Sequence, residues 1–308
     1  MLTDSDVLGF RGRRNEVDPF RPYGFFVEPE RAADGAVLQT TTILLSNREC
    51  PFRCLMCDLW KNTTTSRVPS GAIPEQIRFA LAELPPGDQI KLYNSGNFFD
   101  RQAIPSEDFP RIAAQVAHFQ RVIVECHPKL TGIHCAKFQQ LVGTQLEVAM
   151  GLETSHAETL QLLNKQMTTA DFARACEELL QESIDLRAFI LLRPPQTTEQ
   201  QGIERAIESV RFAFDCGVQC CVVIPVRAGN GIMDHLQVTG RFSPPKLSSL
   251  ETVVDETLAL HRGRVFADLW DLAQFSTCAA CVDKRIRRLE QTNLTQRVSR
   301  QVTCPVCG

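Results

Sequence analysis

The most restrictive feature of this 308-residue chain is a strand-then-helix pattern that repeats from residue 38 to residue 262. β-branched and apolar runs predict buried strands, and amphipathic stretches between them predict helices. This alternation produces right-handed βαβ units and a mainly parallel sheet. We count six units, which favours a partial (β/α)6 barrel. A doubly wound open sheet would show the same pattern, and eight units would close a full barrel.

Individual segments set the expected order of elements. The predicted strands are 38–46, 89–93, 121–126, 146–153, 185–192 and 219–226, with 264–270 as a candidate last strand. The predicted helices are 74–84, 106–119, one from about 157, 171–182, 199–215 and 246–261. In both architectures an active site lies at the carboxyl ends of the strands.

The segments on either side of this pattern differ from it. Residues 1–37 are polar with little periodicity and are expected to form an N-terminal arm. Residues 38–262 are expected to form the barrel, and residues 263–308 a C-terminal extension with four cysteines. The extension lacks a core of its own, so we expect it to need a metal to fold.

Composition indicates a globular protein, with 44% hydrophobic and 22% charged residues. No apolar run approaches the roughly 20 residues of a membrane helix, and no apolar stretch follows the charges at the N-terminus. We therefore expect a cytoplasmic protein. The formal net charge of −3 argues against a surface that is basic throughout, as nucleic-acid binding proteins often have.

Thirteen cysteines are many for a chain in a reducing compartment, where cysteine-rich sequences more often bind metal than form disulfides. Seven of them fall into three close groups, discussed below. The other six are expected to fill the core as small apolar side chains. These are Cys126, Cys135, Cys176, Cys216, Cys220 and Cys221.

The first group, Cys50, Cys54 and Cys57, lies in a loop directly after the first predicted strand. Three thiolates can ligate three irons of a 4Fe–4S cubane and leave the fourth iron open to a ligand. The alternatives are a zinc knuckle, with Asp58 as a fourth ligand, and unligated core thiols.

This Cys-x3-Cys-x2-Cys spacing after a first strand resembles the radical S-adenosylmethionine (SAM) superfamily, whose fold is a six-unit partial barrel. The resemblance implies a 4Fe–4S cluster whose open iron binds the amino and carboxylate groups of SAM. It also implies cleavage of SAM to a 5′-deoxyadenosyl radical, with an electron donor such as flavodoxin or ferredoxin. Met56 stands where the superfamily usually has an aromatic residue.

Two further strand ends supply candidates for SAM binding. The turn after the second strand implies backbone contacts to the amino group, from Asn94, Ser95, Gly96 and Asn97. Glu125 closes the third strand, and a carboxylate in an apolar strand needs a polar partner or a ligand. The adjacent His127 is a candidate for that partner.

The later strand ends supply the remaining candidates. By resemblance, Glu153 after the fourth strand reaches the ribose hydroxyls, and Arg193 after the fifth binds the methionine carboxylate. Arg227 and Asn230 follow the sixth strand near the expected adenine site, where Arg227 could instead contact substrate. No residue stands out as the catalytic acid or base.

The segments RECPFRCLMCDLWKNTT, IKLYNSGNFFD, LLRPP and RAGNG together resemble the radical subunits of archaeosine synthases and their bacterial relatives. The GLET segment also looks like the Elongator catalytic and coproporphyrinogen oxidase branches. The archaeosine resemblance implies a radical lyase step on a lysine-modified 7-deazaguanine in tRNA. The alternatives are a radical enzyme that acts on a small metabolite and a non-catalytic iron–sulfur or zinc adaptor.

Two Cys-x2-Cys pairs, Cys278/Cys281 and Cys304/Cys307, end the chain with 22 residues between them. This spacing predicts zinc, with a second iron–sulfur cluster as the rival. Six basic residues lie between the pairs: Lys284, Arg285, Arg287, Arg288, Arg297 and Arg300. The 284–300 segment is expected either to bind tRNA phosphates or to pack on the barrel and pair with its acids.

Overall fold

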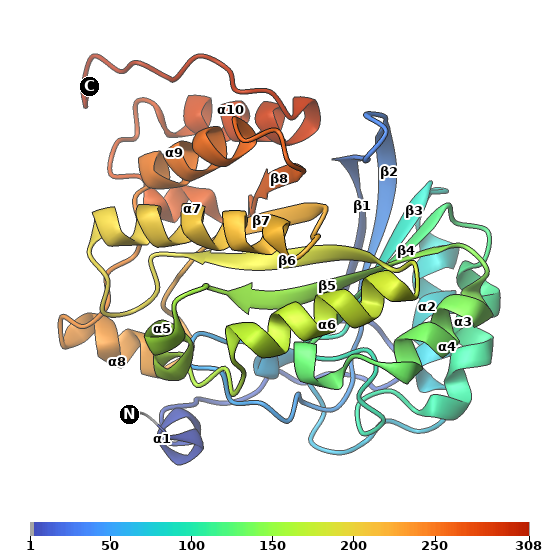
Figure 1. The fold of residues 1–308 in the computed structure, drawn as a ribbon. Coiled ribbons are helices and arrows are strands. Elements are labelled where there is room, and N and C mark those ends of the chain that lie inside the picture. Colours follow the sequence, from blue (N-terminus) through green and yellow to red (C-terminus); the bar gives the residue numbers. More distant parts are fainter. Residues whose placement is uncertain (1–2, 308) are drawn as a thin grey trace.

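The structure, a computed structural model, describes residues 3–307 and contains one eight-stranded sheet whose strands follow chain order (Figure 1). The strands are β1 (Gly24–Arg31), β2 (Val37–Leu44), β3 (Gln89–Tyr93), β4 (Arg121–Cys126), β5 (Gln145–Glu153), β6 (Asp185–Leu192), β7 (Cys220–Pro225) and β8 (Arg264–Ala267). β1 is antiparallel to β2, and every later neighbouring pair is parallel. The seven parallel strands and six helical connections confirm the predicted partial (β/α)6 barrel.

Helices cover the outer side of the curled sheet (Figure 1). The α-helices are α1 (Asp4–Gly9), α2 (Ala72–Glu83), α3 (Phe109–Val116), α4 (Ile133–Val142), α5 (Ala157–Leu162), α6 (Thr169–Gln181), α7 (Glu199–Asp215), α8 (Ile232–Val238), α9 (Leu247–Leu258) and α10 (Val282–Thr295). Short 3-10 helices are η1 (Leu59–Asn62), η2 (Ser106–Asp108), η3 (Pro128–Leu130) and η4 (Leu272–Phe275).

The N-terminal segment contains regular structure that the sequence pattern did not predict. β1 lies inside the expected arm of residues 1–37 and extends the sheet next to β2. Its sequence, GFFVEPER, escapes detection because Pro29 and two glutamates interrupt any apolar alternation. Proline is tolerated there because β1 is an edge strand, which can lack one backbone donor.

Two apolar clusters hold the fold together. The larger one fills the space between the sheet and its outer helices and includes Phe98, Phe138 and Phe172, all fully buried. The smaller one lies at the carboxyl ends of the strands and joins Val7 of α1, Leu55 of the cysteine loop and Met233 of α8. The N-terminal helix therefore packs on the same end of the barrel as the cysteine loop.

The inner face of the sheet carries buried charges instead of an apolar filling. Lys91 Nζ lies 2.6 Å from a Glu30 carboxylate oxygen, and Arg187 bonds both Glu30 and Glu147 at 2.6 Å. All four side chains are almost completely buried. Buried charges of this kind persist only when each one is paired, so the network gives the barrel a satisfied polar interior.

The sheet continues beyond the expected end of the barrel at residue 262. β8 pairs with β7 in parallel, and α10 packs on both β8 and β1, the two edge strands. The division at residues 37/38 and 262/263 stays a prediction.

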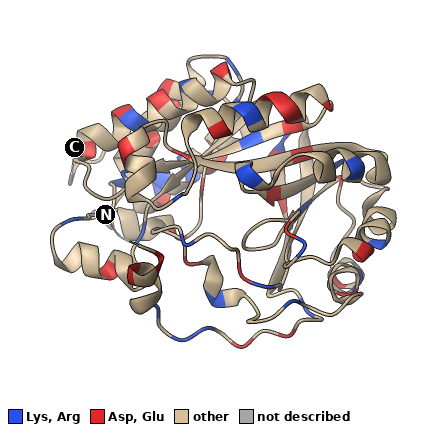
Figure 2. Ribbon diagram, turned by 60° about the horizontal axis from the view of Figure 1, so that its bottom comes forward, with Lys and Arg blue, Asp and Glu red and all other residues tan. Residues whose placement is uncertain are grey.

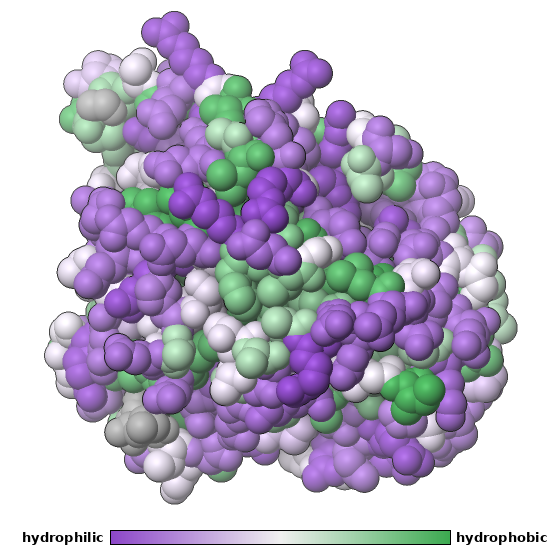
Figure 3. Space-filling model, in the orientation of Figure 1, coloured by the Kyte–Doolittle hydropathy of each residue, from purple (hydrophilic) through white to green (hydrophobic). Residues whose placement is uncertain are grey.

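No helix among residues 3–307 is long and apolar enough to cross a membrane. Figure 3 shows one face of the molecule as largely hydrophilic, with small apolar patches.

Candidate functional site

The cysteine loop lies between β2 and η1, at the carboxyl end of the sheet. Cys54 is buried, and Cys50 and Cys57 are partly buried. Burial raises the pKa of Cys50 to about 11 and those of Cys54 and Cys57 to about 12. Without a cation the three thiols therefore stay protonated at neutral pH, and a bound metal centre would be what ionises them.

The loop supplies three thiols within eight residues, from Cys50 to Cys57. Within residues 3–307, the only His, Cys, Asp or Glu donors that gather as a compact metal-binding set are the four C-terminal cysteines. A single zinc ion usually binds four ligands that converge in this way. Three cysteines from one loop, one buried and two partly buried, are suitable donors to three irons of a cubane with one open iron.

Side chains from two other strand ends hold the loop in place. Asn97 donates from Nδ2 to Cys50 Sγ at 3.1 Å. Asn230 donates to the carbonyls of Leu55 at 2.8 Å and Cys57 at 3.2 Å. A Cβ on Gly96 would lie 3.0 Å from the Cβ of Cys50, so this glycine allows the close approach of turn and loop.

The turn after β3 wraps the carboxylate of Glu125. Oε1 of Glu125 accepts the N–H groups of Asn94 at 2.6 Å and Gly96 at 3.1 Å. Burial raises the pKa of Glu125 to about 7, although the N–H groups of Gly96, Asn94 and Ser95 oppose the rise. The Asn94 side-chain amide is buried with no partner in the described structure for either polar atom, as expected for a group that meets a ligand.

Glu153 meets a residue that the sequence did not single out. Lys165 Nζ lies 2.6 Å from Glu153 Oε1, and both side chains are about 8% exposed. Burial disfavours the ammonium, but the Glu153 carboxylate outweighs it and raises the pKa of Lys165, which lies near Cys50 and Cys54. Lys165 therefore places a buried positive charge beside the cysteine loop. It lies in the LNKQM connection between two helices, which gives no local signal of a site.

His127 does not pair with Glu125, although the two are close in sequence. Its Nδ1 accepts the N–H of Lys129, so the Nε2–H donates to the carbonyl of Lys165 at 3.0 Å. Burial lowers the pKa of His127 to about 3, which keeps the ring neutral. The ring also stacks on Phe52 of the cysteine loop, with centroids 3.7 Å apart. His127 thus joins the Lys165 segment to the loop.

Arg193 and Arg227, the two predicted basic contacts, are both engaged with protein groups. Arg193 bonds Glu199 at 2.6 Å and the carbonyl of Pro244 at 2.7 Å, at the start of α7. Arg227 bonds Asp268, just after β8, at 2.9 Å. Their roles toward SAM stay predictions, and Arg193 is already occupied by a carboxylate.

Residues 3–22 form a segment, here called the strap, that contacts the cysteine loop and its neighbours. Asn164 Nδ2 donates to Asp4 at 2.6 Å, and Val7 is 1% exposed against the smaller apolar cluster. Arg11 bonds Glu49 at 2.5 Å and lies 4.7 Å above the ring of Trp60. Figure 1 shows α1 at the same end of the molecule as α5 and α8.

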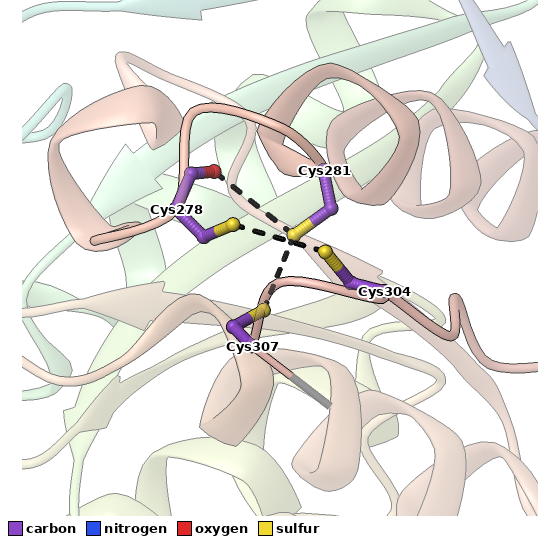
Figure 4. Close-up of side chains that lie close together, drawn as sticks. All are labelled: Cys278, Cys281, Cys304 and Cys307. Atoms are coloured by element: carbon purple, nitrogen blue, oxygen red, sulfur yellow. Dashed lines mark hydrogen bonds between the residues drawn. The ribbon is translucent and has the colours of Figure 1, made fainter.

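The four C-terminal cysteines come together in space (Figure 4). Between the two pairs, Arg285 bonds Glu251 and Arg288 bonds Asp255, both on α9. The other four basic residues are exposed: Lys284, Arg287, Arg297 and Arg300. Figure 2 shows acidic and basic residues interspersed along the chain. Two basic residues of the 284–300 segment therefore pair with acids of the barrel, and the other four stay available for tRNA phosphates.

Comparisons with known proteins give the site its context. No family model matches the chain. Archaeosine synthase subunit beta of Methanosarcina acetivorans is 24% identical over 244 residues, 74% of this chain and 69% of that protein. The subunit of the same name from Thermococcus kodakarensis is 25% identical over 225 residues, 70% of this chain and 69% of that protein.

Solved structures with a similar fold include Methanocaldococcus infernus Elp3, with a TM-score of 0.50, and methylornithine synthase, with 0.52. Each is 13% identical and matches 71% of this chain. The matched regions span 59% and 61% of those two chains, so the chain covers about three fifths of their length. Both are radical SAM enzymes. This chain therefore has the radical SAM fold and resembles archaeosine synthase subunit beta.

Proposed function

We propose that this protein is a radical SAM enzyme with a 4Fe–4S cluster on Cys50, Cys54 and Cys57. The carrying observation is that three thiols, one buried and two partly buried, lie at the carboxyl end of a radical SAM fold. Beside them are the Glu125 carboxylate, which accepts two backbone N–H groups, and the buried ammonium of Lys165. When bound, the cluster supplies the electron that cleaves SAM to methionine and a 5′-deoxyadenosyl radical.

The chain offers charges suited to both ends of the methionine group. Glu125 uses Oε1 to accept two backbone N–H groups, which leaves its other oxygen for the ammonium of SAM. Lys165 carries a buried positive charge near Cys50 and Cys54, so we assign the carboxylate to Lys165 and a structural role to Arg193. Glu153 orients Lys165 and faces the ribose hydroxyls.

The proposed reaction is the modification of a base in tRNA by archaeosine-type lyase chemistry. Its support is the name shared by two relatives, each of which this chain matches over about 70% of both lengths. A small metabolite is the second candidate substrate, favoured by the ion pairs that occupy Arg285 and Arg288.

The first experiment tests radical generation. Anaerobically reconstituted protein, reduced with dithionite and given SAM, is expected to form 5′-deoxyadenosine. Cys54→Ala is expected to lose the product and the iron, whereas the control Cys126→Ser keeps both, because Cys126 is a buried free thiol outside the loop. A cluster-loaded, reduced protein that forms no 5′-deoxyadenosine contradicts the enzymatic proposal.

The second experiment separates the substrates. Mass analysis of tRNA nucleosides from a deletion strain is expected to show one modified base lost and its precursor accumulated. An unchanged nucleoside profile, with normal SAM cleavage by the purified protein, favours the metabolite.

A further inference from the structure

The four C-terminal cysteines have the spacing of ligands on a single ion. Their sulfurs all lie within 4.8 Å of one another, with Cys278 to Cys304 at 3.8 Å and Cys281 to Cys307 at 3.7 Å. Figure 4 shows the four side chains pointing toward one centre from two separate loops. A tetrahedral zinc ion with Zn–S bonds of about 2.3 Å places its sulfurs about 3.8 Å apart. In a cubane each thiolate binds a different iron, so the sulfurs stand farther apart.

Neighbouring groups complete the surroundings expected of a thiolate site. Arg285 Nε donates to Cys281 Sγ, and the backbone N–H of Val306 donates to Cys304 Sγ, both at 3.4 Å. Such outer donors stabilise thiolate charge and orient metal ligands. Arg285 also bonds Glu251 of α9 at 2.5 Å, which ties the site to the barrel.

The segment between the two cysteine pairs covers an open edge of the sheet. Asn293 of α10 bonds both the N–H and the carbonyl of Ala267, each at 2.9 Å. Gln296 does the same at Val265, at 2.8 and 3.0 Å. Two side-chain amides thus replace the missing neighbouring strand along the four-residue β8. An uncovered edge would leave these backbone groups without protein partners.

The return from α10 to the second cysteine pair is also fixed. Arg288 bonds Asp255 of α9 at 2.7 Å and the carbonyls of Ser299 at 2.7 Å and Arg300 at 3.1 Å. The two ends of the 282–303 segment then meet at the cysteines. Loss of the ion would free both ends, because no disulfide joins them.

We propose that Cys278, Cys281, Cys304 and Cys307 bind one Zn²⁺, and that this ion holds α10 against the edge of β8. The site is structural, with four protein ligands and no position left for a substrate. It does not depend on the chemistry at the first cysteine loop.

Metal content tests the first half of this proposal. A variant with Cys50, Cys54 and Cys57 all changed to Ala is expected to contain one zinc per chain and no iron. Adding Cys278→Ser removes the zinc, whereas adding Cys216→Ser, a partly buried cysteine at the end of α7, does not. Cobalt in place of zinc is expected to give the visible spectrum of a tetrahedral thiolate site. Iron–sulfur absorption in the triple variant, or four free thiols without metal, overturns the assignment.

Hydrogen exchange tests the second half. Removing zinc from the otherwise unchanged protein with a chelator is expected to speed exchange at the amides of Val265 and Ala267 about tenfold, and added zinc reverses it. Asn293→Ala is expected to speed exchange at Ala267 while the zinc stays at one per chain. Unchanged exchange at β8 after zinc removal shows that the ion does not hold α10. Because the test uses no SAM, it is independent of the proposed radical activity.

Discussion

Around Lys165, several residues adopt backbone conformations that their side chains disfavour. Glu153, Asn164 and Gln166 have φ values of 65°, 50° and 56°. Non-glycine residues in this region cost of order 1–3 kcal/mol each, and such strain concentrates at functional sites. A Cβ at Gly151 would lie 2.2 Å from Glu153 Oε1, so only glycine leaves room for the Glu153–Lys165 pair. The strain and the glycine together support a functional role for this pair.

Lys165→Met is expected to weaken SAM binding about 10- to 100-fold, because it removes a charged hydrogen-bond donor but keeps most of the apolar stem. Arg193→Met serves as the matched control and should change affinity less than about twofold, since Arg193 is paired with Glu199. Equilibrium dialysis with cluster-loaded protein measures both. If Arg193→Met weakens binding and Lys165→Met does not, the carboxylate belongs to Arg193.

SAM binding should depend on pH through Glu125, whose pKa is raised to about 7. The ionised carboxylate binds the ammonium, so affinity rises as pH increases through 7 and levels off above it. Between pH 6 and pH 8 the ionised fraction grows about tenfold, and the apparent affinity follows it. Calorimetry should also detect proton release on binding near pH 6.5. Glu125→Gln should give weaker binding with a flat profile, and a flat wild-type profile contradicts the role.

Among the elements, the strap of residues 3–22 makes the least expected contribution to the site. Its contacts reach both sides of the cysteine loop, from Asn164 to Trp60. A Cβ on Gly231, whose φ is +93°, would lie 1.9 Å from the carbonyl oxygen of Phe10, so strap and β7–α8 turn pack without space between them. The strap therefore shields the loop and the cluster proposed to bind there.

Val7→Ala should loosen the strap, because it removes two buried methyl groups worth about 1.6 kcal/mol. The fraction of molecules with an open strap then rises roughly 5- to 30-fold. Iron loss to a chelator, followed by the fading of cluster absorbance, should accelerate accordingly. Leu8→Ala is the control, since Leu8 is 46% exposed on the same helix. Equal rates for the two variants mean that the strap does not protect the cluster.

The whole molecule has a formal net charge of −3, so any RNA binding would depend on a local cluster of basic residues. Two exposed cations of the C-terminal extension, Lys284 and Arg287, lie on α10, and Arg297 and Arg300 follow it. They are the candidates for phosphate contacts because Arg285 and Arg288 are held by acids of α9. This arrangement makes the extension the part of the surface where RNA affinity can be tested.

Changing Lys284, Arg287, Arg297 and Arg300 to Ser should weaken tRNA binding and flatten its salt dependence. Each lost phosphate contact lowers the slope of log K against log salt by about 0.7 to 0.9. Gel shifts at several salt concentrations measure the slope. Arg78→Ser with Arg211→Ser, which changes exposed cations on α2 and α7, is the control. Equal slopes for both variants place any RNA contact elsewhere.

The amino-acid sequence alone determined the order of the parallel strands, because buried strands and amphipathic helices leave periodic apolar patterns. The bounds of β3, β4 and β6 match the predicted ranges. It also indicated the three close cysteine groups, since the spacing within each group is local. β1 escaped prediction because a sheet edge admits proline and inward-facing charges, which break the pattern.

Only the tertiary structure decided which charged groups meet. Lys165 pairs with Glu153, whereas Arg193 pairs with Glu199. Arg288 is buried and pairs with Asp255. The convergence of the four C-terminal sulfurs likewise depends on how separate loops pack. Spacing along a chain limits what neighbours can reach, but contacts between distant segments follow from the curvature of the sheet and the packing of its helices.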